Sequence, residues 1–470
     1  MRLILFLATL FFFVDEVKST NIVDVQIDVA GYKKDTIIFG SYFGGERKEI
    51  HPVIRSNDGK FHITSGKLFP EGMYYVQFLP NGDYFEFIFD SDQQFVITTT
   101  YPGILDKIKC SGSAENELFF QCVSIINVNR SDADKKIKMI GLLQFRDPER
   151  AKELQRELDM LNETVVQQQL YFTQRYPNSI SHKYVVASSL PVPDEYNFQD
   201  TIERKKADQY VRTHYFDNID FNDGQLLRSP YPYNMIQSYL NMNLDSPDQL
   251  IAAVDHIMKF IMRANDNKKV YFAFLARLLS SDRPKILEYA HVHLLLSYVQ
   301  GGKTPWISKA DSTQLVSLAI QKEKLLVGKP SPDLIFETKD GTKKSILAND
   351  ARLTVLYFGD YNCDACQEGF SGLLEFSDYF KDKNVKVVGI CTNGGDEYKK
   401  CFKYAEAFHV SFDFLADPVN GRKAKEIFNL PDTPVLFLLD KDKTILAKRL
   451  ALPELYKIVS KELEKDKSNE

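Results

Sequence analysis

The chain has few of the features that mark nucleic-acid-binding or membrane-spanning proteins. Its 59 Lys and Arg residues are outnumbered by 64 Asp and Glu residues, giving a formal net charge of −5. No basic run extends beyond short surface clusters, so the composition does not favour nucleic acid as a partner. The one N-terminal apolar run, Leu3–Val14, is too short to cross a bilayer comfortably as a helix, which takes about 20 residues.

The N-terminus is typical of an export signal. Arg2 precedes the apolar run, and the small residues Ser19 and Thr20 follow it. This order of charge, apolar segment and small residues is that of a secretory signal peptide. We therefore expect residues 1–20 to direct export to the periplasm or cell envelope. If the segment is not cleaved, it anchors the protein to the membrane; a buried N-terminal strand or helix is the alternative.

Cysteine is also sparse, with six in 470 residues. A structural zinc site would need a second closely spaced Cys or His pair, and the sequence has none, so we expect no metal and no cofactor. Disulfides persist outside the cytosol, so the two cysteine pairs that are more widely spaced in the sequence are candidates for disulfide bonds. Cys391 with Cys401 forms either a second disulfide or two free thiols, and the same alternatives hold for Cys110 with Cys122.

The most informative stretch is Gly359–Cys366, which places a Cys-x-x-Cys pair directly after the apolar run Thr354–Phe358. We expect this run to be a buried strand and the chain to turn into a helix at the cysteines. A helix N-terminus carries partial positive charge and free N–H groups, so a thiolate there is stabilised. The two-residue spacing predicts a pair that cycles between dithiol and disulfide.

The two cysteines are expected to have different roles. Cys363, at the exposed start of the helix, is predicted to be the attacking nucleophile, and Cys366, one turn inside, the resolving thiol. Asp360, Asp364 and Asp432 lie nearby and oppose a thiolate, because negative charges disfavour a second anion. The sequence therefore predicts a reducing rather than a strongly oxidising couple.

Two regions precede the cysteine pair. Residues 21–110 alternate apolar and polar side chains between turn signals, which predicts an antiparallel β-sandwich-like domain without catalytic groups. Residues 111–325 change to helical periodicity and predict an all-α domain. Within it, we expect the aromatic segment 214–233 to be core and loop packing rather than a ligand site.

Residues 326–470 begin at a Pro- and Gly-rich cluster and predict an α/β domain. The expected elements are a hairpin (Leu334–Ile346), a strand (Leu353–Phe358), a helix from the cysteine pair, a strand (Val385–Ile390), a helix (Glu397–His409), two strands (Val435–Leu439 and Thr444–Lys448) and a C-terminal helix. This βαβ core followed by a ββα end is the order of the thioredoxin fold.

Three features in this region coincide: the Gly328–Asp333 entry with Pro332, the cysteine pair after a buried strand, and Thr433 with Pro434 about 70 residues later. With them, residues 326–465 resemble the thioredoxin-like extracytoplasmic thiol–disulfide oxidoreductases, a group that includes the membrane-tethered reductases of cytochrome c maturation. The resemblance implies that Thr433 and Pro434 form a cis-proline loop against the cysteine pair, where Thr433 binds an extended substrate segment through its backbone.

The order of the three predicted domains resembles that of multidomain proteins of the Bacteroidota cell envelope. In these proteins a β domain and a helical domain of undefined function precede the thioredoxin domain. The segment His214–Phe221 and Trp306 carry this part of the resemblance. It implies the fold and the redox class, and leaves the substrate open.

The sequence departs from the usual thioredoxin-like site at several positions. Asn362 replaces the Trp that usually precedes the first cysteine, and Tyr357 replaces the usual buried acid on the strand. Gly369 stands where related reductases place a Glu. The proton-transfer role is therefore open, with Asp360 and Glu368 as candidates. Glu368 lies one position before the site of that Glu on the helix, so we expect its side chain to be solvated.

We therefore predict a thiol–disulfide oxidoreductase acting on protein thiols and disulfides outside the cytoplasm, with an upstream electron donor. One alternative is a partner- or polymer-binding envelope protein whose thioredoxin domain is a passive scaffold. Another is a thiol peroxidase of the wider redoxin group. That chemistry requires Thr and Arg around the reactive cysteine, and Asp360, Tyr361 and Asn362 supply neither.

Overall fold

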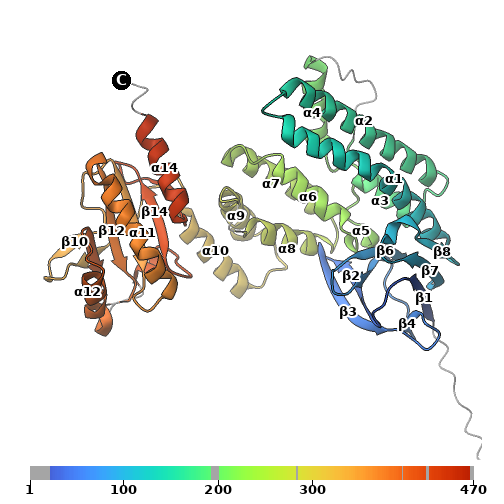
Figure 1. Cartoon of the computed structure of the whole chain (residues 1–470), viewed down its shortest axis with the longest axis horizontal. Coiled ribbons are helices and arrows are strands. Elements are labelled where there is room, and N and C mark those ends of the chain that lie inside the picture. Colours follow the sequence, from blue (N-terminus) through green and yellow to red (C-terminus); the bar gives the residue numbers. More distant parts are fainter. Residues whose placement is uncertain (1–21, 192–200, 282–283, 394, 420–422, 466–470) are drawn as a thin grey trace, which may run out of the picture. The chain divides into compact units, whose positions relative to one another are not determined.

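The computed structural model describes residues 22–191, 201–281, 284–393, 395–419 and 423–465 (Figure 1). Within them the chain forms two compact units. One comprises the described residues up to 244 together with 252–278, and the other comprises 245–251 and the described residues from 279 onward. The predicted export signal, residues 1–20, lies outside the described residues.

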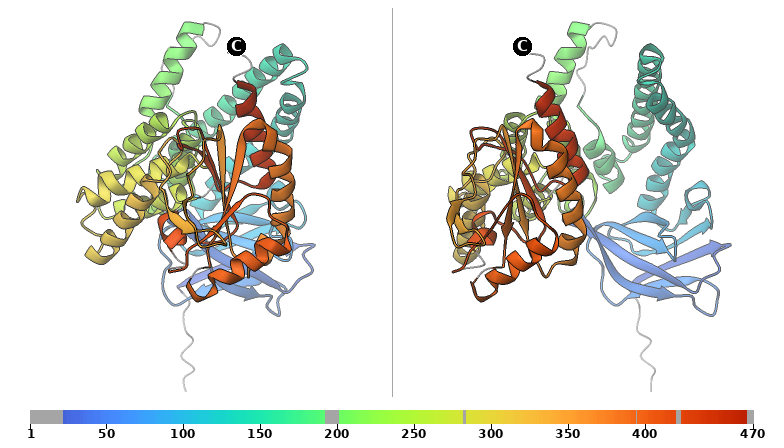
Figure 2. Two further views of the ribbon diagram at one scale, coloured as in Figure 1. Left: turned by 90° about the vertical axis from the view of Figure 1, so that its left-hand side faces the viewer. Right: turned by 60° about the vertical axis from the view of Figure 1, so that its left-hand side comes forward.

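The N-terminal part of the first unit consists of two four-stranded sheets, as the period-2 alternation predicts (Figure 2). Their strand orders are β4-β1-β7-β8 and β3-β2-β5-β6. The strands are β1 (Val23–Ala30), β2 (Thr36–Phe43), β3 (Glu46–Ile54), β4 (Phe61–Ser65), β5 (Gly72–Phe78), β6 (Tyr84–Phe89), β7 (Gln94–Thr100) and β8 (Lys109–Ser111). All pairs are antiparallel except β1 with β7, which run parallel.

Helices follow these sheets, as the change to helical periodicity predicts. They are α1 (Ala114–Leu143), α2 (Pro148–Thr173), α3 (Ile180–Ser188), α4 (Thr201–His214), α5 (Gly224–Leu227), α6 (Tyr231–Asn241), α7 (Pro247–Ile261) and α8 (Lys268–Leu279). Aromatic side chains of the segment 214–233 are buried, among them Tyr215, Phe216 and Phe221. Phe216 packs on Tyr239 with ring centroids 5.1 Å apart, so this segment contributes to the helical core.

The second unit combines the last central helices with a seven-stranded sheet. The helices are α9 (Leu287–Leu294), the π-helix η2 (Leu295–Gln300) and α10 (Lys309–Glu323). The sheet has the order β10-β9-β13-β12-β11-β14-β15. Its strands are β9 (Ile335–Glu337), β10 (Lys343–Ser345), β11 (Leu353–Gly359), β12 (Val385–Cys391), β13 (Asp413–Ala416), β14 (Val435–Leu439) and β15 (Ile445–Lys448).

One strand of this sheet, β13, was not among the predicted elements. It has only four residues and begins with Asp413, so it is too short to show the alternation of apolar and polar side chains by which a strand is recognised. It pairs in parallel with β12, which lies next to β11 in the middle of the sheet. The βαβ core and the antiparallel β14–β15 pair agree with the predicted thioredoxin order.

Both faces of the sheet are covered by apolar side chains. On one face α11 (Asp364–Phe380) and α14 (Leu452–Lys465) lie side by side and contribute Phe376 and Val459 to the core (Figure 2). The other face contains a second cluster that includes Leu325, after α10, and Phe428, after α13 (Lys423–Ile427). The central strand β11 is buried along its whole length, so its C-terminal end has a fixed position from which the cysteine segment begins.

Candidate active site

The cysteine pair lies where β11 ends and α11 begins. Cys363 is the N-cap residue of α11 and has an extended backbone. Its sulfur accepts the backbone N–H of Cys366 at 3.2 Å, and its carbonyl oxygen accepts the same N–H at 3.0 Å. A cysteine sulfur thus takes the place of the Ser, Thr, Asp or Asn oxygen that usually satisfies the free N–H groups at a helix start.

The two thiols have different surroundings. Cys363 is half-buried, whereas Cys366 is fully buried, and both are free thiols. The backbone N–H of Asp360 donates to the Cys366 sulfur at 3.5 Å. Burial raises the pKa of the Cys366 thiol to about 11, because the charged thiolate is disfavoured away from water. This asymmetry suits an accessible attacking thiol and a protected second thiol.

Thr433 and Pro434 lie beside the cysteine pair, in the loop before β14. The peptide bond between them is cis. The thiol of Cys363 donates to the carbonyl oxygen of Thr433 at 3.2 Å. Strand β14 starts immediately after Pro434, and its Val435 pairs with Phe358 of β11. Antiparallel pairing with the central strand therefore holds the Thr433 backbone beside the cysteine segment.

The charges around the site differ from the sequence expectation in one respect. The Asp360 carboxylate lies 3.5 Å from the ammonium of Lys425 on α13 and accepts the N–H of Asn362 at 2.9 Å. Asp364 and Asp432 are exposed, so water screens their charges. Asp360 is thus the least solvated of the three acids, and Lys425 partly neutralises it. Sequence reasoning missed Lys425 because 65 residues separate it from Asp360.

The candidates for proton transfer are not equally placed. Asp360 is half-buried and contacts Cys366 through its backbone, whereas Glu368 is exposed on α11. Tyr357 is buried, and its hydroxyl donates to the Cys366 carbonyl oxygen at 3.4 Å. The buried hydroxyl of Tyr404, on α12 (Tyr398–Ala407), has no hydrogen-bond partner among the described residues. Burial raises the pKa of Tyr404 to about 12, so this hydroxyl keeps its proton at neutral pH and can donate a hydrogen bond.

A disulfide joins Cys391 and Cys401 beside the site. Cys391 ends β12 in register with Gly359, at the same sheet edge as the cysteine segment. Both cysteines are buried, and Tyr361 packs against their cluster. The disulfide therefore fastens α12 to β12 next to the loop that carries Cys363.

Cys110 and Cys122, in contrast, are free thiols. Cys110 is half-buried and Cys122 is buried. Burial raises their pKa values, to about 12 for Cys110 and about 11 for Cys122, so both stay protonated at neutral pH.

The described residues contain no group of three or more His, Cys, Asp and Glu side chains arranged to hold a metal ion. No helix among them is both long enough and apolar enough to cross a membrane.

The region that contains the cysteine pair is similar to known proteins. Residues 327–448 match the model of the AhpC/TSA family. The thiol-disulfide oxidoreductase ResA of Bacillus thuringiensis is 24% identical over 127 residues, which are 27% of this chain and 70% of that protein.

Solved structures are similar to this chain over different lengths. A thioredoxin-like protein from Bacteroides caccae is 20% identical with a TM-score of 0.47, covering 58% of this chain and 98% of its own. The thioredoxin domain of a thiol-disulfide oxidoreductase from Bacteroides vulgatus is 22% identical with a TM-score of 0.27, covering 29% of this chain and 98% of its own.

The C-terminal region is a thioredoxin-like domain of a multidomain protein, preceded by β sheets and a helical middle region. Its family match and its ResA relatives support thiol–disulfide oxidoreductase activity. The predicted resemblance to thioredoxin-like thiol–disulfide oxidoreductases, the predicted fold class and the predicted enzyme class are confirmed.

Proposed function

We propose that this protein reduces disulfide bonds of other proteins through the pair Cys363 and Cys366, outside the cytoplasm. The observation that carries the proposal is the arrangement of the pair. An accessible thiol begins a helix and contacts the Thr433 carbonyl oxygen, while its partner thiol is buried one turn away. Such a pair can hold a substrate on one sulfur and release it with the other.

The reaction has two exchange steps. The Cys363 thiolate attacks one sulfur of a substrate disulfide, forming a mixed disulfide and releasing the first substrate thiolate. The Cys366 thiolate then attacks the Cys363 sulfur, and the second substrate thiolate leaves. The substrate disulfide has gained two electrons, and the enzyme ends with a Cys363–Cys366 disulfide. A dithiol donor must restore the reduced pair by the reverse exchange.

Two other groups are assigned roles in these steps. An extended substrate segment pairs with the Thr433 backbone by strand addition, beside Pro434 and within reach of Cys363. Asp360, rather than Glu368, accepts the proton of Cys366, since Asp360 contacts the buried thiol through its backbone and Glu368 is exposed. The proton passes through water that enters when the substrate displaces the Cys363–Thr433 contact.

The remaining sequence predictions belong to the same proposal. Residues 1–20 direct export to the periplasm or envelope, and residues 21–110, 111–325 and 326–470 act as the β, helical and thioredoxin-like domains. The physiological partners are protein thiols or disulfides and an upstream dithiol donor. The β and helical domains are assigned to partner recognition rather than to redox chemistry.

Reduction of insulin by the full chain, with dithiothreitol as electron donor, tests the proposal. We expect catalysis by the wild type and by Cys110→Ser, which removes a thiol outside the site, and none by Cys363→Ser. Equal rates for the two variants would refute the assignment. Peroxide turnover with a thiol donor, in the absence of insulin reduction, would favour the peroxidase alternative.

A further inference from the structure

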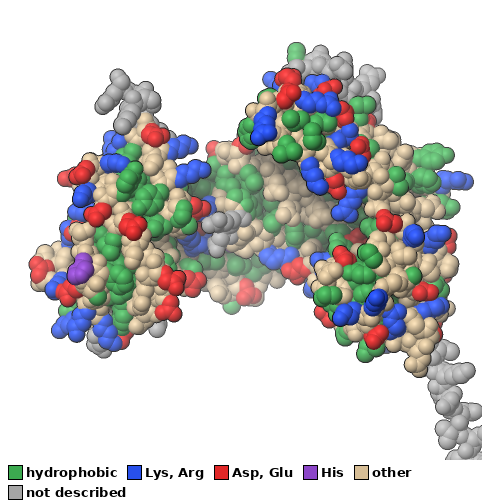
Figure 3. Space-filling view, viewed as in Figure 1, with side chains coloured by type: hydrophobic (Ala, Val, Ile, Leu, Met, Phe, Trp, Pro, Cys, Tyr) green, Lys and Arg blue, Asp and Glu red, His purple; other side chains and the backbone are tan. Residues whose placement is uncertain are grey.

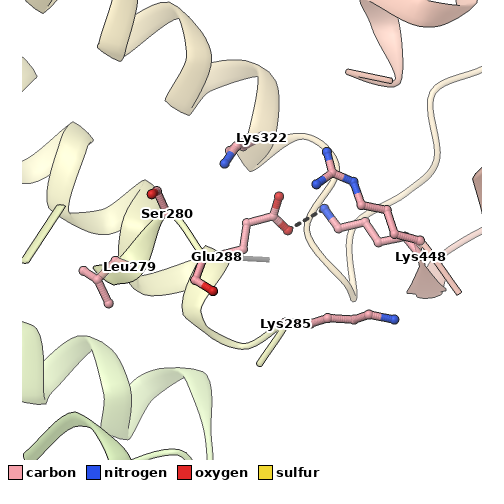
Figure 4. Close-up of a pocket in the computed structure, with 8 residues that line it drawn as sticks. Leu279, Ser280, Lys285, Glu288, Lys322 and Lys448 are labelled. Carbon is pink, nitrogen blue, oxygen red and sulfur yellow. Dashed lines mark ion pairs between the residues drawn. The ribbon is translucent and has the colours of Figure 1, made fainter. Parts of the chain in front are cut away.

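The hydroxyl of Tyr404, on α12, is buried near the cysteine pair and has no hydrogen-bond partner among the described residues. Figure 3 shows basic and acidic side chains interspersed over the visible face of the molecule, where water solvates them. A buried charged pair of the second unit is satisfied, since the ammonium of Lys448 lies 2.5 Å from the carboxylate of Glu288 (Figure 4). Tyr404 is thus an exception to the rule that buried polar groups are hydrogen-bonded.

The Tyr404 ring lies against the helix that carries Cys366. Its centroid is 5.2 Å from that of Phe370, which follows Cys366 by one turn of α11. Residues four positions apart share one face of a helix, and both of these are buried. The Tyr357 ring, on β11, packs on Phe370 at 5.5 Å, and the Tyr357 hydroxyl donates to the Cys366 carbonyl oxygen at 3.4 Å. Two tyrosines from different elements therefore lie beside the buried thiol.

The two thiols act electrostatically on the Tyr404 hydroxyl. Burial raises the pKa of Tyr404 to about 12, and negative charge on Cys366 and on Cys363 acts in the same direction. Since the interaction between two charges weakens with distance, an effect from both sulfurs indicates that the hydroxyl lies near the pair. Tyr404 keeps its proton at neutral pH, so it has a hydrogen-bond donor to offer to an anion formed at this place.

The anion that forms here during turnover is the Cys366 thiolate. In the second exchange step this buried thiol ionises and then attacks the Cys363 sulfur. A neutral thiol is a weak hydrogen-bond acceptor, whereas a hydrogen bond to a charged acceptor is about twice as strong as one between neutral groups. The Tyr404 hydroxyl, which is unsatisfied in the resting protein, therefore has a suitable partner only when Cys366 has lost its proton.

We propose that Tyr404 is a further catalytic residue of the resolving step, whose hydroxyl donates a hydrogen bond to the Cys366 thiolate. This inference rests on the function proposed above. Asp360 takes the Cys366 proton through water, and Tyr404 stabilises the anion without giving up its own proton. The Cys366 sulfur then bonds to the Cys363 sulfur, the bond between Cys363 and the substrate breaks, and its electron pair leaves on the substrate thiolate. The hydrogen bond to Tyr404 ends there, because the negative charge has left Cys366.

The fold itself should gain nothing from this hydroxyl. Tyr404→Phe keeps the ring and its contacts with Phe370 and with Phe408, whose centroid lies 4.8 Å from that of Tyr404. A buried hydroxyl without a partner costs free energy in the folded protein. The variant should therefore be as stable as the wild type or more stable, measured by urea unfolding with Trp306 fluorescence. A hydroxyl with a structural role would give a less stable variant.

Exchange with an aromatic disulfide separates the two steps in one experiment. The reduced full chain releases one aromatic thiol when Cys363 attacks and a second when Cys366 resolves the adduct, and stopped-flow absorbance follows both. In Tyr404→Phe we expect the first phase at the wild-type rate and the second about three- to tenfold slower. Loss of a hydrogen bond to a charged group lowers the thiolate fraction about 10- to 100-fold, and the remaining thiolate is about three- to tenfold more nucleophilic, which offsets part of the loss.

Tyr379→Phe is the matched control, because it removes the hydroxyl of an exposed tyrosine of α11, and both of its phases should have the wild-type rate. A second phase at the wild-type rate in Tyr404→Phe would overturn the inference and leave the proposed function standing. Equal slowing of both phases, or a loss of stability, would show that Tyr404 acts through the fold and would also overturn it. Absence of the second phase in the wild type would refute Cys366 as the resolving thiol, and with it the proposed function.

Discussion

The Cys363 thiol and the Thr433 carbonyl oxygen, 70 positions apart in the chain, lie 3.2 Å apart. A carbonyl oxygen accepts a hydrogen bond from the neutral thiol and offers nothing to the thiolate. Substrate must therefore replace this contact as Cys363 ionises, which joins binding at Thr433 to activation of the nucleophile. The same carbonyl lies where strand addition would place the substrate backbone.

Removal of the second thiol should trap the first intermediate. In Cys366→Ala the substrate stays bonded to Cys363, because the group that attacks this bond is absent. We expect a covalent adduct with a disulfide-containing protein that dithiothreitol releases, measured by intact mass. The double variant Cys363→Ala/Cys366→Ala is the matched control and should form none. An adduct of equal yield in the control would place the reactive thiol elsewhere.

The resolving step should accelerate as pH rises. With a pKa of about 11, Cys366 is almost entirely a thiol at pH 7, and its thiolate fraction grows about tenfold per pH unit up to that pKa. The rate of release should therefore rise between pH 7 and 10. Single-turnover release of an aromatic thiol bound to Cys363 measures this step by absorbance. A rate that is flat over this range would contradict the effect of burial on Cys366.

Asp360 and Lys425 should affect the two exchange steps differently. Asp360→Asn removes a negative charge beside the thiols, so attack by Cys363 should be about two- to fivefold faster, while loss of the proton acceptor slows resolution. Lys425→Gln leaves Asp360 without its counter-charge and should slow the attack by a similar factor. Lys423→Gln, at an exposed lysine of the same helix, is the control. If all three variants have the wild-type rate of attack, this ion pair does not govern the site.

The Cys391–Cys401 disulfide should stabilise the second unit without taking part in turnover. It closes a short loop of sequence separation 10, for which chain entropy predicts about 2–3 kcal/mol of stabilisation. Cys391→Ala/Cys401→Ala should lose about this much while still reducing insulin. Trp306, the one tryptophan of the chain, lies in this unit and reports its unfolding in denaturant by fluorescence.

Dithiothreitol provides the control for this prediction. It should destabilise the wild type and leave the double variant unchanged, because only the wild type has the bond. Loss of insulin reduction in a stably folded double variant would show that the disulfide exchanges with the Cys363–Cys366 pair.

Regular periodicity made much of the fold predictable. The apolar run of β11 and the spacing of Cys363, Cys366, Thr433 and Pro434 lie in strong local patterns, so the sequence indicated the thioredoxin-like arrangement. Strand β13 was missed because it is short and is ordered by pairing with β12. Local pattern carries little information about an element that tertiary pairing stabilises.

Contacts between distant segments were the least predictable part of the site. The pairing of Lys425 with Asp360 and the burial of the Tyr404 hydroxyl depend on how α13 and α12 pack, which the sequence does not encode at short range. The bond between Cys391 and Cys401 likewise depends on the position of α12 against β12.

Equilibration of the full chain with glutathione tests the central claim most directly, with the redox state of Cys363 and Cys366 determined by thiol labelling and peptide mass. Asp360 is half-buried beside the pair and only partly neutralised by Lys425, so its negative charge opposes a thiolate and the dithiol should give up its electrons readily. We predict a potential nearer to about −270 mV, as in thioredoxin, than to about −120 mV, as in a strong oxidant. A value more oxidising than about −180 mV, the level of protein disulfide isomerase, would contradict a reductase and favour an oxidase or isomerase.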